Sequence, residues 1–453
     1  MKKKNRKFTY FIKKFYLEIL IFISSIILIS LVEDRYALTQ QIKVIGKRNA
    51  IHDIHQKENP VCTEGKTLNE LIEETYKKSK ILLYREYKQE FYKLNQDHFK
   101  YHVCIGNSII KIPEYNPNPM INQPLNENIP RKGIYIRWDL ASIDNIVSLV
   151  QKIKGTEINA LVIDAKDIVG VLTYKSNDPI VKKYQPYAPI IKDFPKLVDF
   201  LHKNRIYIIV RLALFQDMNL IKHRKDLAIY NPNTLSKTIE YKGQPIWVDP
   251  AKEEVQDYNL RILKELISFG VDEVQFDYIR YPAEGNLDKV EYYKVKHSND
   301  KIQHLINFLF KAWMIAYPTS TRLSIDVFGI TAWQERKDIE TTGQDLSKLS
   351  VWIDWISPML YPSHFGLFFE NLQNPADYPE YFYKKGIEKI KNLVPEHVKI
   401  RPWIQAFKWR VSNYNQTYIK RQIQTIEENQ GHGWLMWNAA NDYDIALKAI
   451  KNN

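Results

Sequence analysis

Short apolar runs alternate with longer amphipathic segments from residue 131 to the end of the chain. The runs have the length of buried strands, and the segments between them carry apolar residues at helical spacing. The segment from Val255 to Phe269, for example, follows Asp249-Pro250, a cap and first-turn pair, and ends at Gly270. The eight predicted strands are Gly133–Trp138, Ala160–Lys166, Ile206–Phe215, Glu273–Ile279, Leu323–Phe328, Trp355–Leu360, Val398–Ala406 and Gly433–Asn438.

Eight strand-then-helix units favour one particular architecture. No predicted strand is followed by a Gly-x-Gly-x-x-Gly turn, so a doubly wound nucleotide-binding sheet fits less well than a (β/α)8 TIM barrel. We therefore expect an α/β fold, a TIM barrel over residues 131–453. The longest gap between strands, from Phe215 to Trp247, predicts a large loop at the active-site end.

The alternation within the strands separates outward from inward side chains. Outward residues of a barrel strand meet helices and are apolar, whereas inward residues near the carboxyl end face a pocket. In the fourth strand Val274 and Phe276 share one parity and Asp277 has the other; Asp326 has the inward parity of the fifth strand. The residues predicted to point inward are Asp164, Lys166, Arg211, Glu273, Gln275, Asp277, Ser324, Asp326, Arg401, Trp403 and Gln405.

Polar side chains from at least five strands thus converge on one end of the barrel. Two interpretations follow. They form an active site, or they neutralise one another as a buried network, with Asp164 paired to Arg211 for instance.

A different pattern opens the chain. The apolar run from Phe15 to Val32 is interrupted only by Glu18 and three serines, and it follows a leader with seven basic residues and no acid. Basic residues before such a run and acidic residues after it predict that the rest of the chain is exported. The run is short for a spanning helix, yet no small-x-small cleavage site ends it. For residues 1–36, an uncleaved membrane signal anchor and a cleaved signal peptide both stay open.

The stretch 37–112 is expected to be a helical extracytoplasmic segment. Thr67 and Glu70 have the spacing of a capping box, and apolar residues follow at helical intervals. Prolines and asparagines crowd the next stretch, 113–130, which cannot continue a helix and is interpreted as a linker to the barrel.

Cys62 and Cys104 flank the helical pattern, and they are the two cysteines of the chain. One continuous helix from Leu68 to Asn95 would be about 40 Å long and would keep them apart. A disulfide therefore requires a helical hairpin. A possible disulfide in an oxidising compartment and two free thiols are the alternatives.

Composition narrows the class of protein. Of the 453 residues, 45% are hydrophobic and 26% charged, which suits a chain with a large core and excludes disorder. The formal net charge is +13, but seven of these charges lie in the leader and no basic run follows, so we expect no nucleic-acid partner.

Several catalytic signatures are missing from the sequence. It has no His-Glu-x-x-His, no Cys-x-x-Cys, no Gly-x-Ser-x-Gly and no glycine-rich phosphate loop after the seventh or eighth strand. Lys166, between Asp164 and Asp167, is interpreted as a charged partner rather than a Schiff-base lysine. We expect no metal and no cofactor, although aspartates can also hold Ca²⁺.

Of the catalytic mechanisms considered, one that uses paired carboxylates remains compatible with the sequence. Asp277 and Asp326 are predicted on adjacent strands, and paired carboxylates with aromatic faces for sugar rings suit the hydrolysis of a glycosidic bond. Each aromatic residue also has an alternative place in the core. The tryptophans expected around the pocket are Trp138, Trp247, Trp333, Trp403, Trp434 and Trp437.

Seven motifs now point to a known family. They are Gly133-Ile-Tyr135, Ala160-Leu-Val-Ile-Asp-Ala-Lys-Asp167, Trp247-Val-Asp-Pro250, Val271-Asp-Glu-Val-Gln-Phe-Asp-Tyr-Ile-Arg-Tyr-Pro282, Ser324-Ile-Asp-Val-Phe-Gly329, Ser357-Pro-Met-Leu-Tyr-Pro362 and Gly433-Trp-Leu-Met-Trp-Asn438. In this order they resemble the putative glycosyl hydrolase domain family, bacterial barrels distantly similar to α-amylase-type glycosidases.

That resemblance implies a nucleophilic aspartate at the end of strand four and an acid at the end of strand five or six. Asp277 then takes the first role and Asp326 the second, although the usual acid is a glutamate. The residues expected to bind substrate are Asp164, Lys166, Arg211, Gln275, Arg280, Tyr361, Trp403, Gln405, Trp437 and Asn438.

The sequence thus predicts an exported glycoside hydrolase, attached to the membrane by its amino-terminal helix and acting on a cell-envelope or environmental polysaccharide. A glycan-binding barrel without catalysis would keep the tryptophans but need neither aspartate. A structural envelope protein, with residues 37–112 as its working part, is the third alternative.

Overall fold

A computed structural model describes residues 61–79, 84–100, 103–113, 129–185, 190–241 and 243–451. The anchor or signal peptide expected at 1–36, and most of the linker expected at 113–130, lie outside these residues. Among the helices of the described part, none combines the length and the apolar character needed to cross a bilayer.

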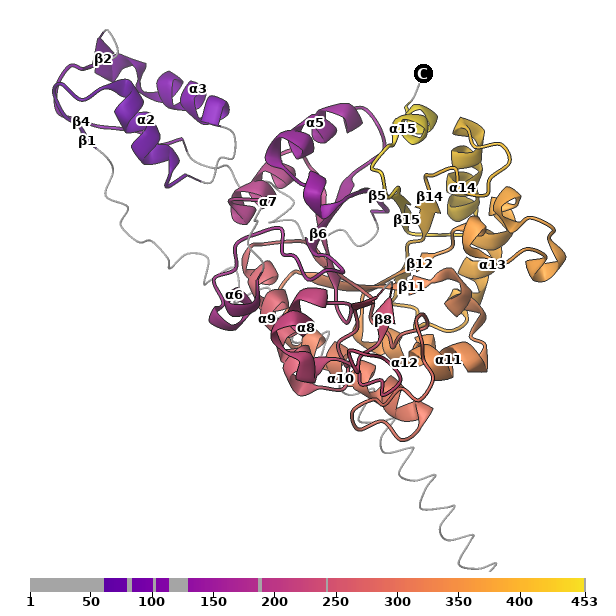
Figure 1. Ribbon diagram of the computed structural model, residues 1–453. Coiled ribbons are helices and arrows are strands. Elements are labelled where there is room, and N and C mark those ends of the chain that lie inside the picture. The colour runs from indigo at the N-terminus through magenta and orange to yellow at the C-terminus, as the bar shows by residue number, and fades with distance from the viewer. Residues whose placement is uncertain are drawn as a thin grey trace, which may run out of the picture.

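The main body is a curled parallel sheet surrounded by helices (Figure 1). Its strands pair in the order β13-β12-β11-β10-β7-β6-β5-β15-β14. Their bounds are β5 Arg131–Ile136, β6 Ala160–Lys166, β7 Tyr207–Ala213, β10 Glu273–Asp277, β11 Arg322–Phe328, β12 Trp355–Met359, β13 Lys399–Ile400, β14 Trp403–Gln405 and β15 Gly433–Trp437. The prediction of an α/β barrel is confirmed.

The two end strands of this order, β13 and β14, are halves of the predicted seventh strand. Pro402 has no N–H to donate and interrupts the strand between them. The backbone still bridges both neighbours, because Arg401 N donates to Ile356 O of β12 and Leu435 N of β15 donates to Pro402 O, each at 2.9 Å. The sheet is thereby closed through this position.

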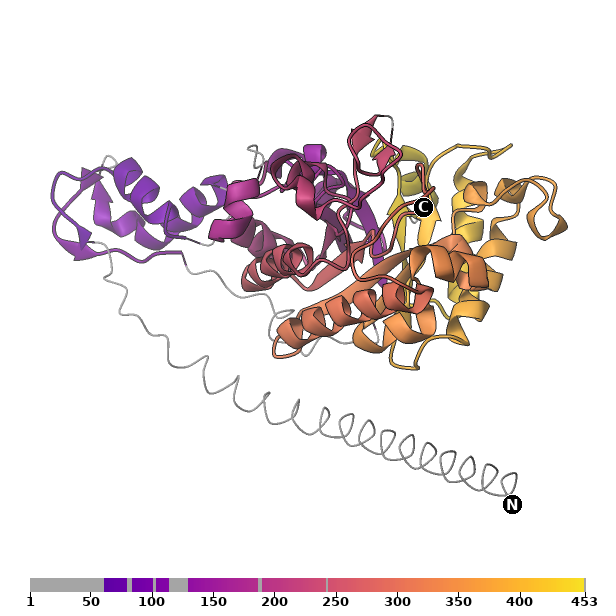
Figure 2. The same ribbon diagram turned by 60° about the horizontal axis from the view of Figure 1, so that its bottom comes forward.

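The predicted helical segments cover the outside of the sheet (Figure 2). In the described part of the barrel they are α5 Ile143–Ile153, α6 Pro179–Tyr184, α7 Phe194–Lys203, α8 Met218–His223, α9 Glu253–Ser268, α10 Ser298–Ala316, α11 Arg336–Thr342, α12 Leu346–Leu349, α13 Pro379–Lys391, α14 Gln416–Glu428 and α15 Asp444–Ile450. Apolar outward residues such as Val274 and Phe276 are buried against this layer. The gap from Phe215 to Trp247 contains α8 and the short hairpin β8 Glu240–Tyr241 with β9 Gln244–Pro245.

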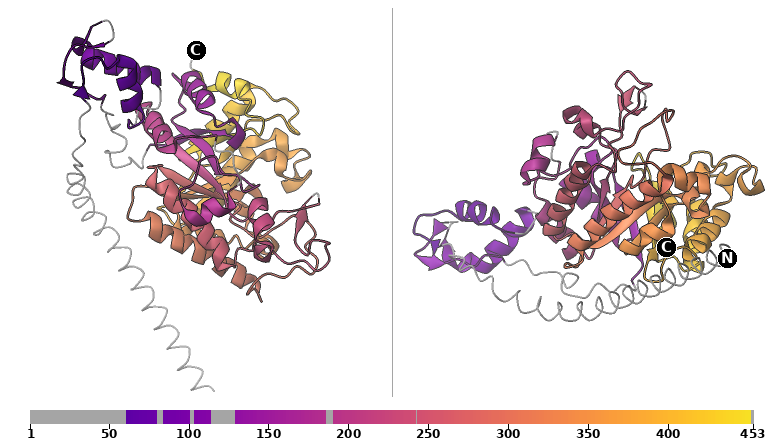
Figure 3. Two further views of the ribbon diagram at one scale, coloured as in Figure 1. Left: turned by 60° about the vertical axis from the view of Figure 1, so that its left-hand side comes forward. Right: turned by 90° about the horizontal axis from the view of Figure 1, so that it is seen from below.

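The described residues between 61 and 113 form a small unit of their own, drawn in indigo beside the barrel (Figure 3). Its helices are α2 Leu68–Tyr76, with the Thr67–Glu70 capping box, and α3 Tyr84–Asn95. The strand pairs β1 Val61–Cys62 with β4 Ser108–Ile109, and β2 Phe99–Lys100 with β3 Val103–Cys104, complete it.

A disulfide joins Cys62 and Cys104, whose Cα atoms lie 5.8 Å apart. The helical pattern is thus divided into two helices, which brings the flanking cysteines together. The buried residues of its hydrophobic core are Cys62, Leu68, Leu71, Ile72, Tyr87, Phe91, Cys104 and Ile110.

Candidate active site

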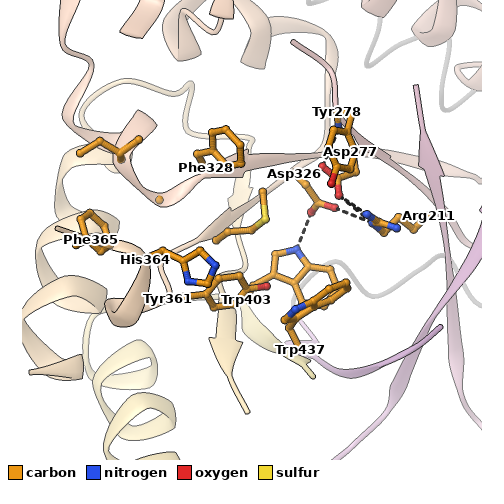
Figure 4. A pocket seen from close by; sticks show the side chains of 13 residues that line it. Arg211, Asp277, Tyr278, Asp326, Phe328, Tyr361, His364, Phe365, Trp403 and Trp437 are labelled. Atoms are coloured by element: carbon orange, nitrogen blue, oxygen red, sulfur yellow. Dashed lines mark hydrogen bonds and ion pairs between the residues drawn. The ribbon is translucent and has the colours of Figure 1, made fainter. Parts of the chain in front are cut away.

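A cavity of about 430 Å³ opens at the carboxyl end of the barrel strands (Figure 4). Asp277 is the last residue of β10, and Asp326 lies in the neighbouring strand β11, where Phe276 pairs with Ile325. Both aspartates therefore have the inward parity predicted for them. The cavity is lined by Arg211, Asp277, Tyr278, Asp326, Phe328, Gly329, Ile330, Met359, Tyr361, His364, Phe365, Trp403 and Trp437.

Arg211, from β7, lies between three carboxylates. Its Nη2 and Nε donate to Oδ2 of Asp277 at 2.6 and 2.9 Å, and its Nη1 donates to Oδ1 of Asp164 at 2.7 Å. Asp164 in turn accepts a hydrogen bond from the hydroxyl of Tyr135 at 2.6 Å. The Asp164–Arg211 pair expected from the sequence is present, and it fixes the guanidinium against Asp277.

The third carboxylate, Asp326, is close to the same guanidinium without a hydrogen bond to it. Its Oδ2 lies 4.0 Å from Nε of Arg211. Because Oδ2 of Asp277 is 2.9 Å from that Nε, the two carboxylate oxygens are at most about 6.9 Å apart, the sum of these distances. The pair is therefore close enough to act on one bond.

Asp277 and Asp326 have different surroundings. Asp277 accepts two hydrogen bonds from Arg211 and one from the backbone N–H of Tyr278 at 2.6 Å. Asp326 accepts one, from Nε1 of Trp403 at 2.7 Å. Burial, together with the charge of Asp277, raises the pKa of Asp326 well above its usual value. The site thus holds one ion-paired carboxylate beside one whose pKa is raised.

The backbone turns sharply after Asp277. Tyr278 has a φ of 53°, which is strained for a residue other than glycine, so β10 stops two residues before the predicted end at Ile279. A second turn follows Phe328. A Cβ on Gly329 would lie 2.5 Å from the carbonyl oxygen of Met359, so glycine is required there.

The structure brings together five of the residues expected to bind substrate. Arg211, Tyr361, Trp403 and Trp437 line the cavity, and Asp164, outside the lining, accepts a hydrogen bond from Arg211. Of the tryptophans expected there, Trp403 and Trp437 are lining residues, whereas Trp138, Trp247, Trp333 and Trp434 are not. Trp247 and Trp434, for instance, are fully buried in the apolar core.

Lys166 lies outside the cavity, contrary to its predicted inward direction. Asp164 pairs with Arg211 but Lys166 pairs with Leu212, so one extra residue between them reverses the parity. Lys166 is fully buried against Asp217, with Nζ 2.8 Å from Oδ2.

Four further residues expected in the site do not line the cavity and instead bind neighbouring parts of the barrel. Gln275, deeper in the barrel, donates to Oγ of Ser357 at 3.2 Å. Arg280 is ion-paired with Glu284 at 3.1 Å. Gln405 and Asn438 bind backbone carbonyls of neighbouring loops.

The cavity is also lined by residues that were not predicted to bind substrate, among them Tyr278, Ile330, Met359, His364 and Phe365. They lie at strand ends or in the loops after strands, where alternation no longer applies. The available sequence signal was that Tyr278 directly follows Asp277, and that Met359 lies within the Ser357–Pro362 motif. Among the described residues, no group of His, Cys, Asp and Glu side chains could hold a metal ion.

Comparisons with known proteins identify the family and the fold of the chain. The profile of the putative glycosyl hydrolase domain matches residues 133–443. The chain has no match among curated proteins.

Solved structures give matches at low identity. A hypothetical protein from Ruminiclostridium thermocellum ATCC 27405 is 29% identical, over 43% of this chain and 97% of its own, with a TM-score of 0.38. The PgaB (BpsB) glycoside hydrolase domain from Bordetella bronchiseptica is 13% identical, over 71% of this chain and 98% of its own, with a TM-score of 0.53. A noncanonic maltogenic alpha-amylase, AmyB from Thermotoga neapolitana, is 13% identical, over 72% of this chain and 70% of its own, with a TM-score of 0.44. The likeness to the PgaB domain shows the shared fold.

Proposed function

Because the chain belongs to the putative glycosyl hydrolase domain family, we propose that it is a glycoside hydrolase in which Asp277 is the nucleophile and Asp326 the general acid. The main observation in support of this proposal is that the two carboxyl groups have different electrostatic surroundings. Arg211 is ion-paired with Asp277 at 2.6 Å, whereas burial and that neighbouring charge raise the pKa of Asp326. Two acids held in opposite protonation states are what this chemistry requires.

The proposed reaction has two steps. Asp277 attacks the anomeric carbon while Asp326 gives its proton to the glycosidic oxygen, so the sugar–oxygen bond breaks and a glycosyl ester forms on Asp277. Water then attacks the anomeric carbon and gives a proton to the carboxylate of Asp326, and the ester bond to Asp277 breaks. Arg211 holds the nucleophile in place through both steps.

The spacing of the carboxylates supports retention of configuration. Retaining enzymes have carboxyl groups about 5–5.5 Å apart and inverting ones roughly 6.5–9.5 Å. The upper limit of about 6.9 Å between the two Oδ2 atoms, set by the shared Nε of Arg211, includes the retaining range and reaches only the lower end of the inverting range.

Export and membrane attachment are part of the proposal. The basic leader and the apolar run Phe15–Val32 support them. The Cys62–Cys104 disulfide is consistent with an oxidising compartment outside the cytoplasm. Cell fractionation followed by protease treatment of spheroplasts tests this part, and a protease-protected soluble protein would contradict it.

The catalytic proposal is tested by screening the full chain against peptidoglycan, chitin, chitosan, cellulose, xylan and starch for both cleavage and binding. Asp277→Asn should abolish cleavage but keep binding, because an amide has a similar shape and cannot form the ester. Asp326→Asn should impair natural glycans most and activated aryl glycosides least, since these need no proton.

Asp257→Asn is the matched control. Asp257 lies on α9, its side chain is 60% exposed, and it pairs with Arg261 outside the barrel. Wild-type cleavage by Asp277→Asn would contradict the assignment of the nucleophile. A wild-type protein that binds glycans and cleaves none would instead be a glycan-binding barrel.

A further inference from the structure

A series of aromatic rings leads from the carboxylates to the rim of the cavity. Trp403, hydrogen-bonded to Asp326, and Tyr361 belong to the same buried cluster inside the barrel. The ring of His364 lies 5.1 Å from that of Tyr361, and the ring of Trp409 lies 5.1 Å from that of His364. Trp409 itself is beyond the cavity lining and 53% exposed.

Trp409 is held in a fixed orientation although it is on the surface. The guanidinium of Arg410 lies over its ring, 5.1 Å from the centroid, and Nη1 of Arg410 donates to the carbonyl oxygen of Ser363 at 3.2 Å. Arg410 has a φ of 60°, a conformation that is costly outside glycine and is often found in ligand-binding loops. Arg410 thus supports the indole ring, while Trp409 as a whole remains exposed to solvent.

A single buried side chain ties together the two loops that carry these rings. Gln405, at the end of β14, donates through Nε2 to the carbonyl oxygens of Phe407 and Trp409, both at 3.1 Å. Its Oε1 accepts from the backbone N–H of Ser363, next to His364, at 3.2 Å. The positions of His364 and Trp409 are therefore set from the barrel itself.

We propose that His364 and Trp409 form an outer subsite for a second or third sugar ring of a glycan chain whose cleaved linkage lies at Asp277 and Asp326. The inference rests on the proposed glycosidase function. An exposed, rigidly held aromatic face that continues from an aromatic cavity suits the apolar face of a sugar ring. A substrate that ends within the cavity would leave this platform unused, so the preferred substrate is an oligomer or polymer.

The test measures kcat/KM against chain length. Chito-, cello- and malto-oligosaccharides from the dimer to the octamer are offered to the full chain, and the series that the wild type cleaves is followed. Wild-type kcat/KM should rise with length. In Trp409→Ala the ratio of octamer to dimer kcat/KM should fall about tenfold, equivalent to the loss of one aromatic contact. Trp409→Phe should keep most of that ratio.

Tyr92→Ala is the control, because Tyr92 is a similarly exposed aromatic residue, 44% accessible, in the separate disulfide-linked unit. A length dependence that is the same in Trp409→Ala and the wild type would overturn the outer subsite and leave the glycosidase proposal standing. A wild type that cleaves and binds none of the glycans would overturn both. A circular-dichroism spectrum and melting curve identical to the wild type exclude misfolding of the variants.

Discussion

Trp403 donates the one hydrogen bond that Asp326 receives from a side chain of the described residues, from indole Nε1 to Oδ1 at 2.7 Å. This bond stabilises the charged form of Asp326 and so opposes the rise in pKa that burial and Asp277 cause. Trp403 therefore adjusts how readily the acid gives up its proton.

Replacing this donor should shift the pH profile upwards. In Trp403→Phe the charged form of Asp326 loses a hydrogen bond, so its pKa should rise further, by about one unit if the bond is worth about 1.5 kcal/mol. The alkaline limb of kcat/KM, which reports loss of the acid's proton, should move to higher pH by that amount. The measurement is the pH dependence of cleavage of whichever glycan the wild type hydrolyses.

Trp437→Phe is the matched control for this shift. The ring of Trp437 packs against that of Trp403 at 5.8 Å and also lines the cavity, but it gives Asp326 no hydrogen bond. The alkaline limb of kcat/KM for Trp437→Phe should stay at the wild-type pH. Equal shifts in both variants would contradict the role given to Nε1 of Trp403.

Asp326 should also make stability depend on pH. A carboxyl group whose pKa is raised by folding holds its proton more tightly in the folded state. Its contribution to stability is complete below the unfolded pKa of about 3.9 and is lost as the pH rises towards the folded pKa, by at most about 1.4 kcal/mol for each pH unit. Asp326→Asn has no proton to lose.

The variant should therefore be more stable than the wild type at pH 7, and the difference should shrink towards pH 4. Denaturant unfolding of Asp326→Asn, Asp257→Asn and the wild type across this range measures it. If the difference in unfolding free energy between Asp326→Asn and the wild type does not change with pH, folding does not raise the pKa of Asp326.

The inward acids could be predicted because a strand alternates with a period of two. Outward residues such as Val274 and Phe276 must meet helices, so Asp277 has to face the interior, and the same holds for Asp326. The break of the seventh strand also has a visible cause in Pro402.

Other features carry no such signal. A single extra residue after Asp164 reverses the direction of Lys166, and nothing in the local composition marks that irregularity. His364 and Trp409 lie in loops, whose conformation depends on distant partners such as Gln405 rather than on a repeat. The rim of the site therefore emerges only from the three-dimensional structure.

The corrected position of Lys166 leads to a prediction about stability. Lys166 and Asp217 are both fully buried and 2.8 Å apart. Lys166→Met would leave a buried carboxylate without its cation and should cost about 3–5 kcal/mol of unfolding free energy. In Lys166→Met/Asp217→Asn neither member of this pair is charged, and the amide oxygen can still accept from Leu220 N in the first turn of α8.

The double variant should therefore recover part of the loss, as a double-mutant cycle with Asp217→Asn would quantify by urea unfolding. Glycan affinity, measured well below the unfolding transition, should not follow these changes. A Lys166→Met protein of wild-type stability with weakened glycan binding would restore Lys166 to the substrate site.

Loss of the disulfide should destabilise the unit of residues 61–113 and leave the stability of the barrel unchanged. That unit has a small apolar core, and Cys62 and Cys104 close a loop across a sequence separation of 42 residues. By the loop-entropy relation such a cross-link is worth about 4 kcal/mol, a large share of the stability available to so small a unit. Cys62→Ala/Cys104→Ala, or reduction of the wild type, should therefore open it.

Hydrogen exchange followed by mass spectrometry on the full chain measures the effect. Amides of α2 and α3 should exchange much faster without the disulfide, while those of the barrel strands keep their protection. The barrel is an internal control, because the chain has no other cysteine and a reductant can act nowhere else. Unchanged exchange in α2 and α3 would show that the apolar core holds this unit without the cross-link, whereas a loss of protection in the barrel as well would show that the two parts unfold together.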